Sequence, residues 1–524
     1  MTKKGIRVTP KYKQVGFETA VRNPERYLGI LSAILKYENK ILDDECLLEI
    51  VTQLYLAWEV TSEEITILNE TTSEEIKDLV VKVNSSRKAD GGFPQGYASR
   101  FWTYMRTMSE LWMVYARYKE VFKLSEIAKM LIRGEIDEQE AFSMQAMKYN
   151  RKSPYRNVSN DYNFFALTLR ILLFLKEHNK RLSYEQFAVL MFNQSGEISE
   201  TLWILSAQRL SNEEQTFKFL NNHYWNTNKL NTVMKDYPDV ARRIMIISGF
   251  ITIKYEGIKF IQINENKLNY IKELLSIEYH LTEEEKEDAN KYFLKMESYN
   301  EIYLNIAKKY RDVDAMDWQK YTNIIYNIIQ LYDIDEEKII QCINDIGTKS
   351  LSIIPEFKEI PAPLKLEFYI AILIALKYKD EFIIKPNYKV DHIWKPYSHA
   401  PGNEGDIEIY SQDIYWLIEV TLIRNKIQQL NNETTSLVRH MHAKDEFKDH
   451  NTKCLSFIAP VVHEDTKDYL DTALIRNQVS GKSTFIKPYT IHEFLTVTSE
   501  KKNIIDMDNY SRSILDEYRL KLSL

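Results

Sequence analysis

Two acidic residues, Asp406 and Glu419, lie in neighbouring stretches whose composition favours a β-hairpin. The stretches 405–410 and 414–421 are rich in β-branched and aromatic residues, and a short polar segment separates them. If the turn centres on residues 412–413, Asp406 lies directly opposite Glu419, and both side chains point to the same face with Cβ atoms about 5 Å apart. Two carboxylates at that spacing repel each other, and one takes up a proton unless a positive charge lies between them.

A divalent metal ion is the simplest source of that positive charge. Carboxylate oxygens are hard ligands that suit Mg²⁺, which binds proteins through one or two carboxylates and keeps several waters. A water polarised by such an ion can attack a phosphodiester. The alternative is a surface hairpin whose charges face water. Glu419 favours the metal site because it interrupts an apolar run, 416–420, that is typical of a strand covered on both faces, where charges seldom lack a partner or a metal.

Other elements of the C-terminal third must position this pair. A helix over 364–373 carries Glu367 in an apolar stripe, where it either reaches the hairpin or pairs with a lysine at the core edge. The loop 398–403 delivers the chain to Asp406 and carries His399, which is a candidate general base, a phosphate ligand or a loop hydrogen-bonding group. Strands are also expected at 382–384, 455–460 and 484–488, with helices at 428–442 and from 491. This order predicts an α/β core with helices on both sides.

The composition bounds the class of protein. A chain of 524 residues predicts two to four domains, and 44% hydrophobic with 27% charged residues is ordinary for a soluble globular protein. The three cysteines are far apart and form no CxxC pair, which fits a reducing cytoplasm and argues against structural zinc. Neither a signal peptide nor an apolar run long enough to span a membrane is present, so we expect a cytoplasmic protein without a membrane partner.

Basic residues are clustered although the net charge is −6. The segment 148–181 has eight Lys and Arg against two acids, which gives +6, and residues 1–13 carry five basic residues and no acid. Basic and aromatic residues together suit a surface that follows a phosphate backbone, and solvated helix faces are the alternative. The candidate DNA contacts are Arg87, Lys88, Arg100, Arg106, Arg151, Lys152, Arg156, Arg242, Arg243 and Lys254.

The segment 237–276 has the element order of a winged helix. A helix from Tyr237 is followed by strands at 250–255 and 258–263, which a Glu-Gly turn joins, and then by a second helix. In that fold one helix enters the major groove and the wing touches the backbone, although winged helices also serve as protein–protein modules. Further helices are predicted at 26–60, 103–132, 161–177, 186–192, 317–332 and 335–345, with others opening at Ser211 and, as one long helix, at Thr282.

The residues around the hairpin resemble those of the AlwI-type restriction endonucleases. The resemblance rests on the run 398–409, on 419–421 and on Glu433 with 437–440, and it weakens over the first hundred residues. These enzymes cut DNA a few bases outside an asymmetric site and include natural nicking enzymes. The resemblance implies a PD-(D/E)xK nuclease core. By position it makes Asp406 and Glu419 the metal ligands, with the backbone carbonyl of Val420 as a third.

Two positions depart from the usual motif of that nuclease core. Gly405 replaces a proline, which is tolerable because a turn into the strand needs none. Thr421 stands where the usual lysine would position the attacking water and offset charge on the phosphorane. The resemblance implies that additional acids, Glu367 and Glu433, act here with His399 nearby. Whether a second metal ion replaces the lysine is open.

We therefore expect a multidomain chain: a mostly α-helical N-terminal DNA-recognition region with winged-helix elements, a helical linker, and a C-terminal α/β PD-(D/E)xK nuclease domain. The expected boundaries are 1–195, 196–280, 281–355 and 356–524. The expected function is that of a type IIS-like restriction endonuclease in restriction–modification and phage defence. It would hydrolyse double-stranded DNA with Mg²⁺ and leave 5′-phosphates.

A single candidate site per chain has a consequence for partners. Cutting both strands requires a second copy or a separate small nuclease subunit, and otherwise the protein nicks one strand. One alternative is a catalytically inactive DNA-binding or specificity subunit, which Thr421 favours. Another is a glycosidase that uses Asp406 and Glu419 as acid and nucleophile, but no aromatic-lined sugar cleft is evident in the sequence.

Overall fold

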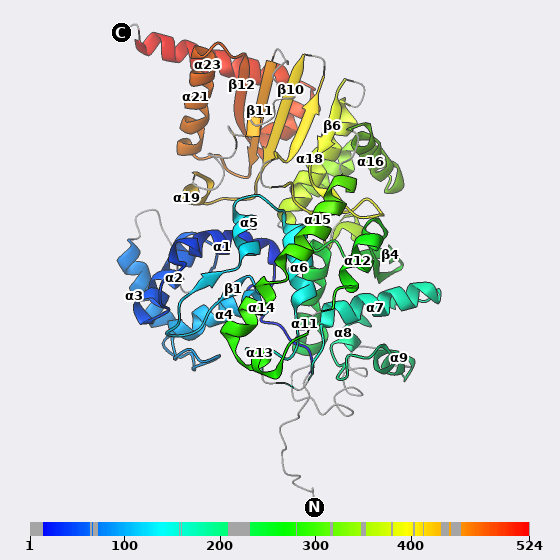
Figure 1. Ribbon diagram of the computed structural model, residues 1–524. Helices are drawn as coiled ribbons and strands as arrows, with labels where there is room; N and C mark the ends of the chain where they lie inside the picture. Colours follow the sequence, from blue (N-terminus) through cyan, green and yellow to red (C-terminus); the bar gives the residue numbers. More distant parts are fainter. Residues whose placement is uncertain are drawn as a thin grey trace, which may run out of the picture. The chain divides into compact units, whose positions relative to one another are not determined.

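The computed structural model groups the chain into two compact units, Met1–Asp312 and Val313–Leu524 (Figure 1). It describes residues 14–62, 65, 72–156, 158, 160–207, 231–278, 280–314, 318–346, 353–378, 381–401, 404–411, 413–430, 437, 440–441 and 452–522. Among these residues, no helix is long and apolar enough to cross a membrane. The domain boundaries predicted from the sequence stay predictions. The division at 312–313 places the helices of the predicted linker 281–355 in both units.

The first unit is mostly helical, and a large apolar core extends through it from Val15 to Ala307. Its helices are α1 (Tyr27–Ile34), α2 (Asp44–Leu56), α3 (Ser73–Asn84), α4 (Tyr97–Glu110), α5 (Glu126–Ile132), α6 (Glu138–Lys148), α7 (Phe164–Glu177), α8 (Phe187–Leu190), α9 (Ile198–Ala207), α11 (Tyr237–Ile247), α12 (Leu268–Leu275), α13 (Glu283–Glu287), α14 (Ala289–Glu297) and α15 (Asn300–Asp314). Side-chain caps begin several of them; Asn163, for example, accepts a hydrogen bond from the N–H of Ala166 before α7.

Three helices of this unit were predicted to be longer than they are. The helix predicted at 103–132 ends at Glu110, because Trp112 takes a positive φ of 57° and the chain forms the ribbon β1 (Val114–Tyr115) and β2 (Lys123–Leu124) before α5. The helix predicted at 26–60 is interrupted where Asp43 caps α2. The helix opening at Thr282 stops at Glu287, since Asp288 caps α14. Capping side chains and a buried tryptophan decide these ends. The helix predicted from Ser211 lies outside the described residues.

The helix–strand–strand–helix order predicted at 237–276 is present. Helix α11 leads into β4 (Ile251–Glu256), which pairs with β5 (Ile258–Ile263), and α12 follows. The strand β3 (Leu182–Ser183) adds to β5, so the small sheet has the order β3-β5-β4. Assignment of these elements to a winged-helix fold stays a prediction.

The second unit is built on a five-stranded mixed sheet. Its strand order is β12 (Thr484–Thr490), β11 (Thr452–Ala459), β10 (Ile414–Val420), β9 (Ile407–Tyr410) and β6 (Ile383–Pro386). Strands β10, β11 and β12 are parallel to one another, whereas β9 is antiparallel to both of its neighbours. The other elements are the ribbon β7 (Lys389–Val390) with β8 (Pro396–Ser398) and the helices α16 (Trp318–Leu331), α17 (Glu336–Asn344), α18 (Ala362–Tyr378), α19 (Lys426–Gln428), α21 (Glu464–Val479), α22 (Ile491–Ser499) and α23 (Asn503–Leu522).

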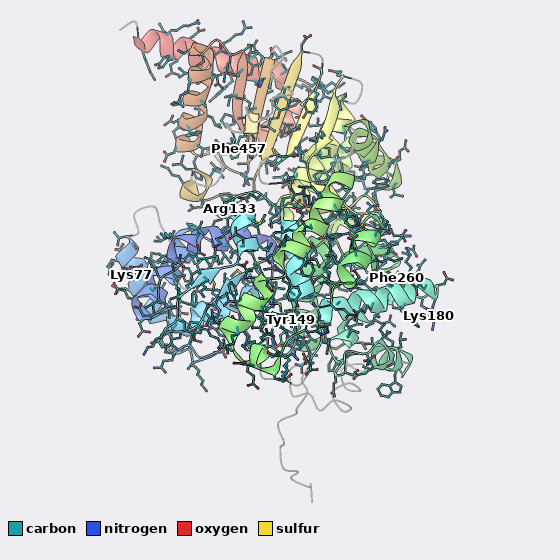
Figure 2. All side chains as sticks on the ribbon, viewed as in Figure 1. Lys77, Arg133, Tyr149, Lys180, Phe260 and Phe457 are labelled. Carbon is teal, nitrogen blue, oxygen red and sulfur yellow. The ribbon has the colours of Figure 1, made fainter. Side chains whose placement is uncertain are left out.

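Apolar side chains cover both faces of this sheet. Ile407 and Ile418 belong to a core with α16, α17, α18 and α22, while Leu417 and Phe457, the latter labelled in Figure 2, belong to a second core with Leu470 of α21. Alternate residues of each strand therefore enter different cores. The sheet is a layer between helices, as the apolar run around Glu419 predicts.

Candidate active site

The predicted hairpin is confirmed, and its register places Asp406 across from Glu419. Ile407 pairs with Ile418, and the same offset relates Leu417 to Glu408. The next position outward, at the end of the hairpin away from its turn, brings Asp406 level with Glu419. Since Ile407 and Ile418 share one core, both acids point toward the opposite face by alternation.

Backbone and side-chain hydrogen bonds hold the two carboxylates. Asp406 Oδ2 accepts the backbone N–H of Val420 at 2.8 Å, which ties this side chain to the end of β10. Glu419 is 7% exposed, and its Oε1 lies 2.7 Å from His440 Nδ1. His440 belongs to the sequence resemblance only as part of a run, and the tertiary structure reveals its contact with Glu419.

Glycine at position 405 makes room for Glu419. A Cβ atom on Gly405 would lie 2.8 Å from Glu419 Oε1 and 2.2 Å from Leu417 Cδ1, both too close for real Cβ contacts. The expected reason for this glycine, that the turn needs no proline, is therefore incomplete. Any side chain here, proline included, would collide with Glu419. The collision also shows that the Glu419 carboxylate reaches the residue next to Asp406.

Asn387 is a second positioning residue that the sequence did not single out. Its side-chain amide donates to the carbonyl of Gly405 at 2.6 Å, and its backbone N–H donates to the carbonyl of Asp406 at 3.0 Å. The two bonds hold the successive peptide groups on either side of Asp406. Asn387 thus fixes the start of the strand from the neighbouring β6 edge.

Glu367 and His399 form a pair of their own. Glu367, on α18, is 3% exposed, and its Oε1 lies 2.5 Å from His399 Nδ1. Burial, with the Glu367 charge as a second cause, holds the pKa of the neighbouring Tyr388 well above its ordinary value. Among the described residues no group of three or more His, Cys, Asp or Glu is close enough to hold a metal ion. The structure thus does not gather Glu367 with Asp406 and Glu419 as one metal-binding cluster.

Two other predicted site residues have different outcomes. Thr421 is 7% exposed; its Oγ1 accepts the N–H of Ile423 at 3.2 Å and its own N–H donates to Ile458 at 2.9 Å, so it shapes the chain leaving β10. Glu433 lies outside the described residues.

The donor set fits a small divalent cation. Asp406 and Glu419 offer hard carboxylate oxygens on one face, and Val420 ends the strand beside them. Mg²⁺ is commonly bound by one or two carboxylates together with waters and substrate phosphates. A pair of carboxylates, with the remaining ligands from water and DNA, is within that pattern.

Three of the predicted DNA contacts lie inside the first unit. Arg156 forms two hydrogen bonds to Glu110, at 2.6 and 2.7 Å. Arg151 is 1% exposed, and Arg242 is 5% exposed with its guanidinium 3.8 Å from the Tyr184 ring centroid. Burial of these side chains gives them structural roles here and leaves them poorly placed to meet a phosphate.

The other predicted contacts are nearer the surface. Arg87 donates to Thr103 and Arg100 to Tyr104. Lys88 is exposed. Four more are in ion pairs with acids: Arg106 with Glu110 and Asp90, Lys152 with Glu283, Arg243 with Asp239, and Lys254 with Glu256. The spacing of four residues between Asp239 and Arg243 was a readable signal for one of these pairs.

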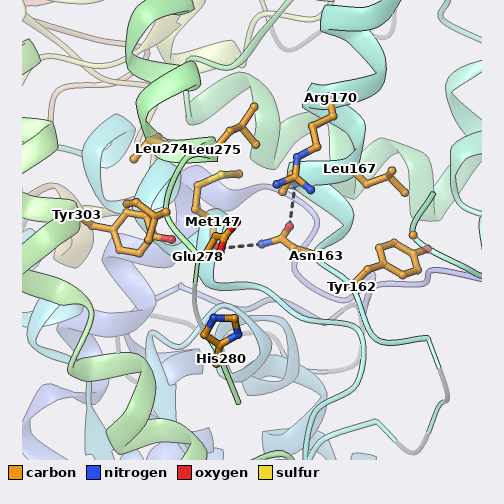
Figure 3. Close-up of a pocket in the computed structure, with 13 residues that line it drawn as sticks. Met147, Tyr162, Asn163, Leu167, Arg170, Leu274, Leu275, Glu278, His280 and Tyr303 are labelled. Atoms are coloured by element: carbon orange, nitrogen blue, oxygen red, sulfur yellow. Dashed lines mark hydrogen bonds between the residues drawn. The ribbon is translucent and has the colours of Figure 1, made fainter. Parts of the chain in front are cut away.

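A pocket of about 380 Å³ opens in the first unit (Figure 3). Its lining includes Arg170 and Asn163 of the α7 region, Leu274 of α12, and His280. Asn163 donates to the carbonyl of Met147 at 2.8 Å. None of the predicted site residues lines this pocket.

Comparison with known proteins gives a family match. A family model described as AlwI restriction endonuclease matches residues 109–362 and 354–497. No curated protein matches the chain. Among solved structures, the small subunit of the heterodimeric restriction endonuclease R.BspD6I is 17% identical, with 34% of this chain and 87% of that chain covered and a TM-score of 0.26. A likeness at this level is too weak to identify a fold.

Proposed function

Because the chain belongs to the AlwI restriction endonuclease family and is a site-specific deoxyribonuclease, we propose that Asp406 and Glu419 form the site at which it hydrolyses DNA. The observation that carries this proposal is the hairpin register, which sets the two acids level on one face. The hydrogen bonds from Val420 and His440 then hold one oxygen of each carboxylate. In this reading the second unit is a PD-(D/E)xK nuclease.

The proposed cofactor is Mg²⁺. When bound, it would polarise the scissile phosphate as a Lewis acid and supply a hydrolytic water at neutral pH. Asp406 and Glu419 would hold it, with the carbonyl of Val420 as a third protein ligand. The hydrogen bond from His440 would orient the Glu419 carboxylate, as outer-shell partners of metal ligands commonly do.

The proposed reaction is hydrolysis, and water and the phosphodiester are its two reactants. A water oxygen bonds to phosphorus, the bond from phosphorus to the 3′ oxygen breaks, and its electron pair leaves with that oxygen, which gains a proton. The products are a 5′-phosphate and a 3′-hydroxyl. His399, whose Nδ1 lies at Glu367 Oε1, is the proposed general base or phosphate ligand.

Double-stranded DNA is the proposed substrate, and the first unit is proposed to bind it. The winged-helix elements and the basic side chains nearest the surface, among them Lys88, Lys152, Arg243 and Lys254, supply the proposed contacts. Exposed cations that contact phosphates give affinity that falls with salt. One candidate site per chain supports either a second copy or a small partner subunit for double-strand cleavage, and nicking without one.

A plasmid assay tests this function. Supercoiled DNA incubated with the protein and Mg²⁺ should be nicked or linearised, and sequencing of the ends should return one recurring site at a fixed offset. Asp406→Asn should abolish cutting while DNA binding persists, because only the carboxylate charge at the site is lost. Asp413→Asn removes the same charge from an exposed position at the other end of the hairpin and should still cut.

Two results would contradict the proposal. Wild-type protein that binds but leaves many different plasmids intact would favour an inactive DNA-binding or specificity subunit. Cutting that survives in Asp406→Asn would show that the catalytic site lies elsewhere.

A further inference from the structure

One lysine of the second unit lies beside the strand that carries Asp406. Lys385, on the edge strand β6, pairs across the sheet with Glu408 of β9. Its Nζ lies 3.4 Å from Glu408 Oε2 and 3.6 Å from Glu404 Oε2. These acids are two residues before and two residues after Asp406. An ammonium that reaches both therefore lies against the segment that begins β9.

The surroundings of Lys385 are largely shielded from water. Its side chain is 14% exposed and that of Glu408 is 2% exposed. Tyr410 also donates its hydroxyl to Glu408, and burial together with the Glu408 charge raises the pKa of Tyr410, so the hydroxyl keeps its proton. Glu408 thus has a second donor besides the lysine. Glu404, which also lies near the ammonium, is 33% exposed, and its distance of 3.6 Å is the longer of these two.

Alternation puts Lys385 on the same face as the acid pair. Ile384 enters the core shared with Ile407 and Ile418, so Lys385 points the other way, as Asp406 and Glu419 do. The attraction between a cation on this face and a negatively charged group strengthens as water is excluded, because charges interact more strongly at low dielectric.

A cation on this face would add to the positive charge that the proposed metal ion supplies. The scissile phosphate brings negative charge to a face that already holds two carboxylates, and in the transition state negative charge is spread over the non-bridging oxygens and the leaving oxygen. At the end of β10, Thr421 is neutral, and its hydroxyl is engaged with Ile423. We propose that Lys385 supplies this positive charge from the β6 edge, moving from Glu404 to a non-bridging phosphate oxygen when DNA is bound. The inference rests on the proposed site at Asp406 and Glu419.

Removing the charge tests the proposal on the full-length protein. Lys385→Met keeps an apolar stem and should cut plasmid DNA on the order of 100-fold more slowly in a single turnover at saturating DNA and Mg²⁺, which is the size expected for losing one transition-state donor. DNA affinity measured with Ca²⁺ in place of Mg²⁺ should change little. Lys385→Arg should retain much of the rate because it keeps the charge.

Mn²⁺ affinity distinguishes loss of the lysine charge, which should raise it, from loss of structure, which should lower it. Without DNA, Lys385→Met should bind Mn²⁺ more tightly than wild type, measured by electron paramagnetic resonance, since a nearby positive charge no longer repels the ion. A variant whose site had merely collapsed would bind Mn²⁺ more weakly. Tighter metal binding with slower cutting is the expected combination.

A double variant separates the reaction from simple neutralisation of Glu408. If Lys385 only balanced that carboxylate, Glu408→Gln would restore the cutting rate of Lys385→Met. The expected result is that the double variant stays slow. Lys487→Met is the matched control, because Lys487 is a 19% exposed lysine on β12 of the same sheet, 2.6 Å from Asp506, and its loss should leave cutting intact.

The outcomes distinguish this inference from the function itself. Wild-type protein that does not cut would remove the proposed function and the inference with it. Wild-type cutting together with an equally fast Lys385→Met, restoration by Glu408→Gln, or weaker Mn²⁺ binding would overturn the role of Lys385 and leave the acid pair standing.

Discussion

At the scale of single residues, the proposed site depends on the absence of a side chain at position 405. Gly405 leaves the space into which the Glu419 carboxylate extends, 2.8 Å from where a Cβ would stand. The carboxylate there also contacts His440. A residue without a side chain next to Asp406 is thus a condition for the arrangement of both acids.

Gly405→Ala should therefore reduce both the cutting rate and the free energy of unfolding. The added methyl group pushes Glu419 from its position and strains Leu417, and overpacking of this kind costs about 1–3 kcal/mol. We expect a single-turnover cutting rate lower by roughly tenfold or more, if one transition-state interaction weakens. Urea unfolding and plasmid cutting on the same preparations measure the two effects. Wild-type cutting by Gly405→Ala would contradict the described position of Glu419.

At the scale of elements, buried ion pairs join segments that the sequence suggested for DNA. Arg156 lies in a loop and Glu110 ends α4, and their two hydrogen bonds connect these segments inside the first unit. Lys152, only four residues away from Arg156, pairs instead with the exposed Glu283. Neighbouring basic residues of one cluster thus have different tasks.

Two substitutions in that cluster should behave oppositely. Arg156→Ala removes two hydrogen bonds from the buried Glu110 carboxylate, which keeps the longer contact with Arg106 at 3.4 Å, and should cost up to about 3 kcal/mol of unfolding free energy. Lys152→Ala breaks an exposed pair and should cost at most about 1 kcal/mol. If Lys152 contacts a phosphate, its loss should reduce the slope of log affinity against log salt by about 1. Urea unfolding and salt-dependent gel shifts measure these effects. An unchanged unfolding free energy of Arg156→Ala would contradict the structural role of this arginine.

At the scale of the whole molecule, the chain separates into two units with cores of their own. The first has its apolar core from Val15 to Ala307, and the second has its sheet between two helical layers. A unit with its own core commonly folds alone. This division suits a protein in which one part binds DNA and another cuts it.

Residues 313–524 expressed alone should fold and cut without sequence preference, because the proposed site is complete within the unit while the proposed DNA-binding surface is not. Residues 1–312 alone should bind DNA and leave it uncut. Circular dichroism, cooperative urea unfolding and plasmid assays of the separate fragments measure this. Specific cutting by 313–524 would place recognition in the nuclease unit.

The sequence by itself determined the hairpin and the alignment of its two acids. Strand side chains alternate with a period of two, and a short polar turn sets the register, so Asp406 and Glu419 follow from local spacing alone. The helix at Glu367, the strands of the sheet and the two-stranded ribbon after α11 were predictable for the same reason. Each depends on residues close together in the chain.

Only the tertiary structure decided the partners of those side chains. The contacts of Glu419 with His440, Glu367 with His399, Asn387 with Gly405 and Lys385 with Glu408 join segments about 20 to 30 residues apart, and that of Arg156 with Glu110 spans more. No local pattern encodes which cation meets which acid, because burial and packing choose among many possible pairs. For that reason the sequence revealed the two acids of the proposed site, and the folded chain revealed which side chains contact them.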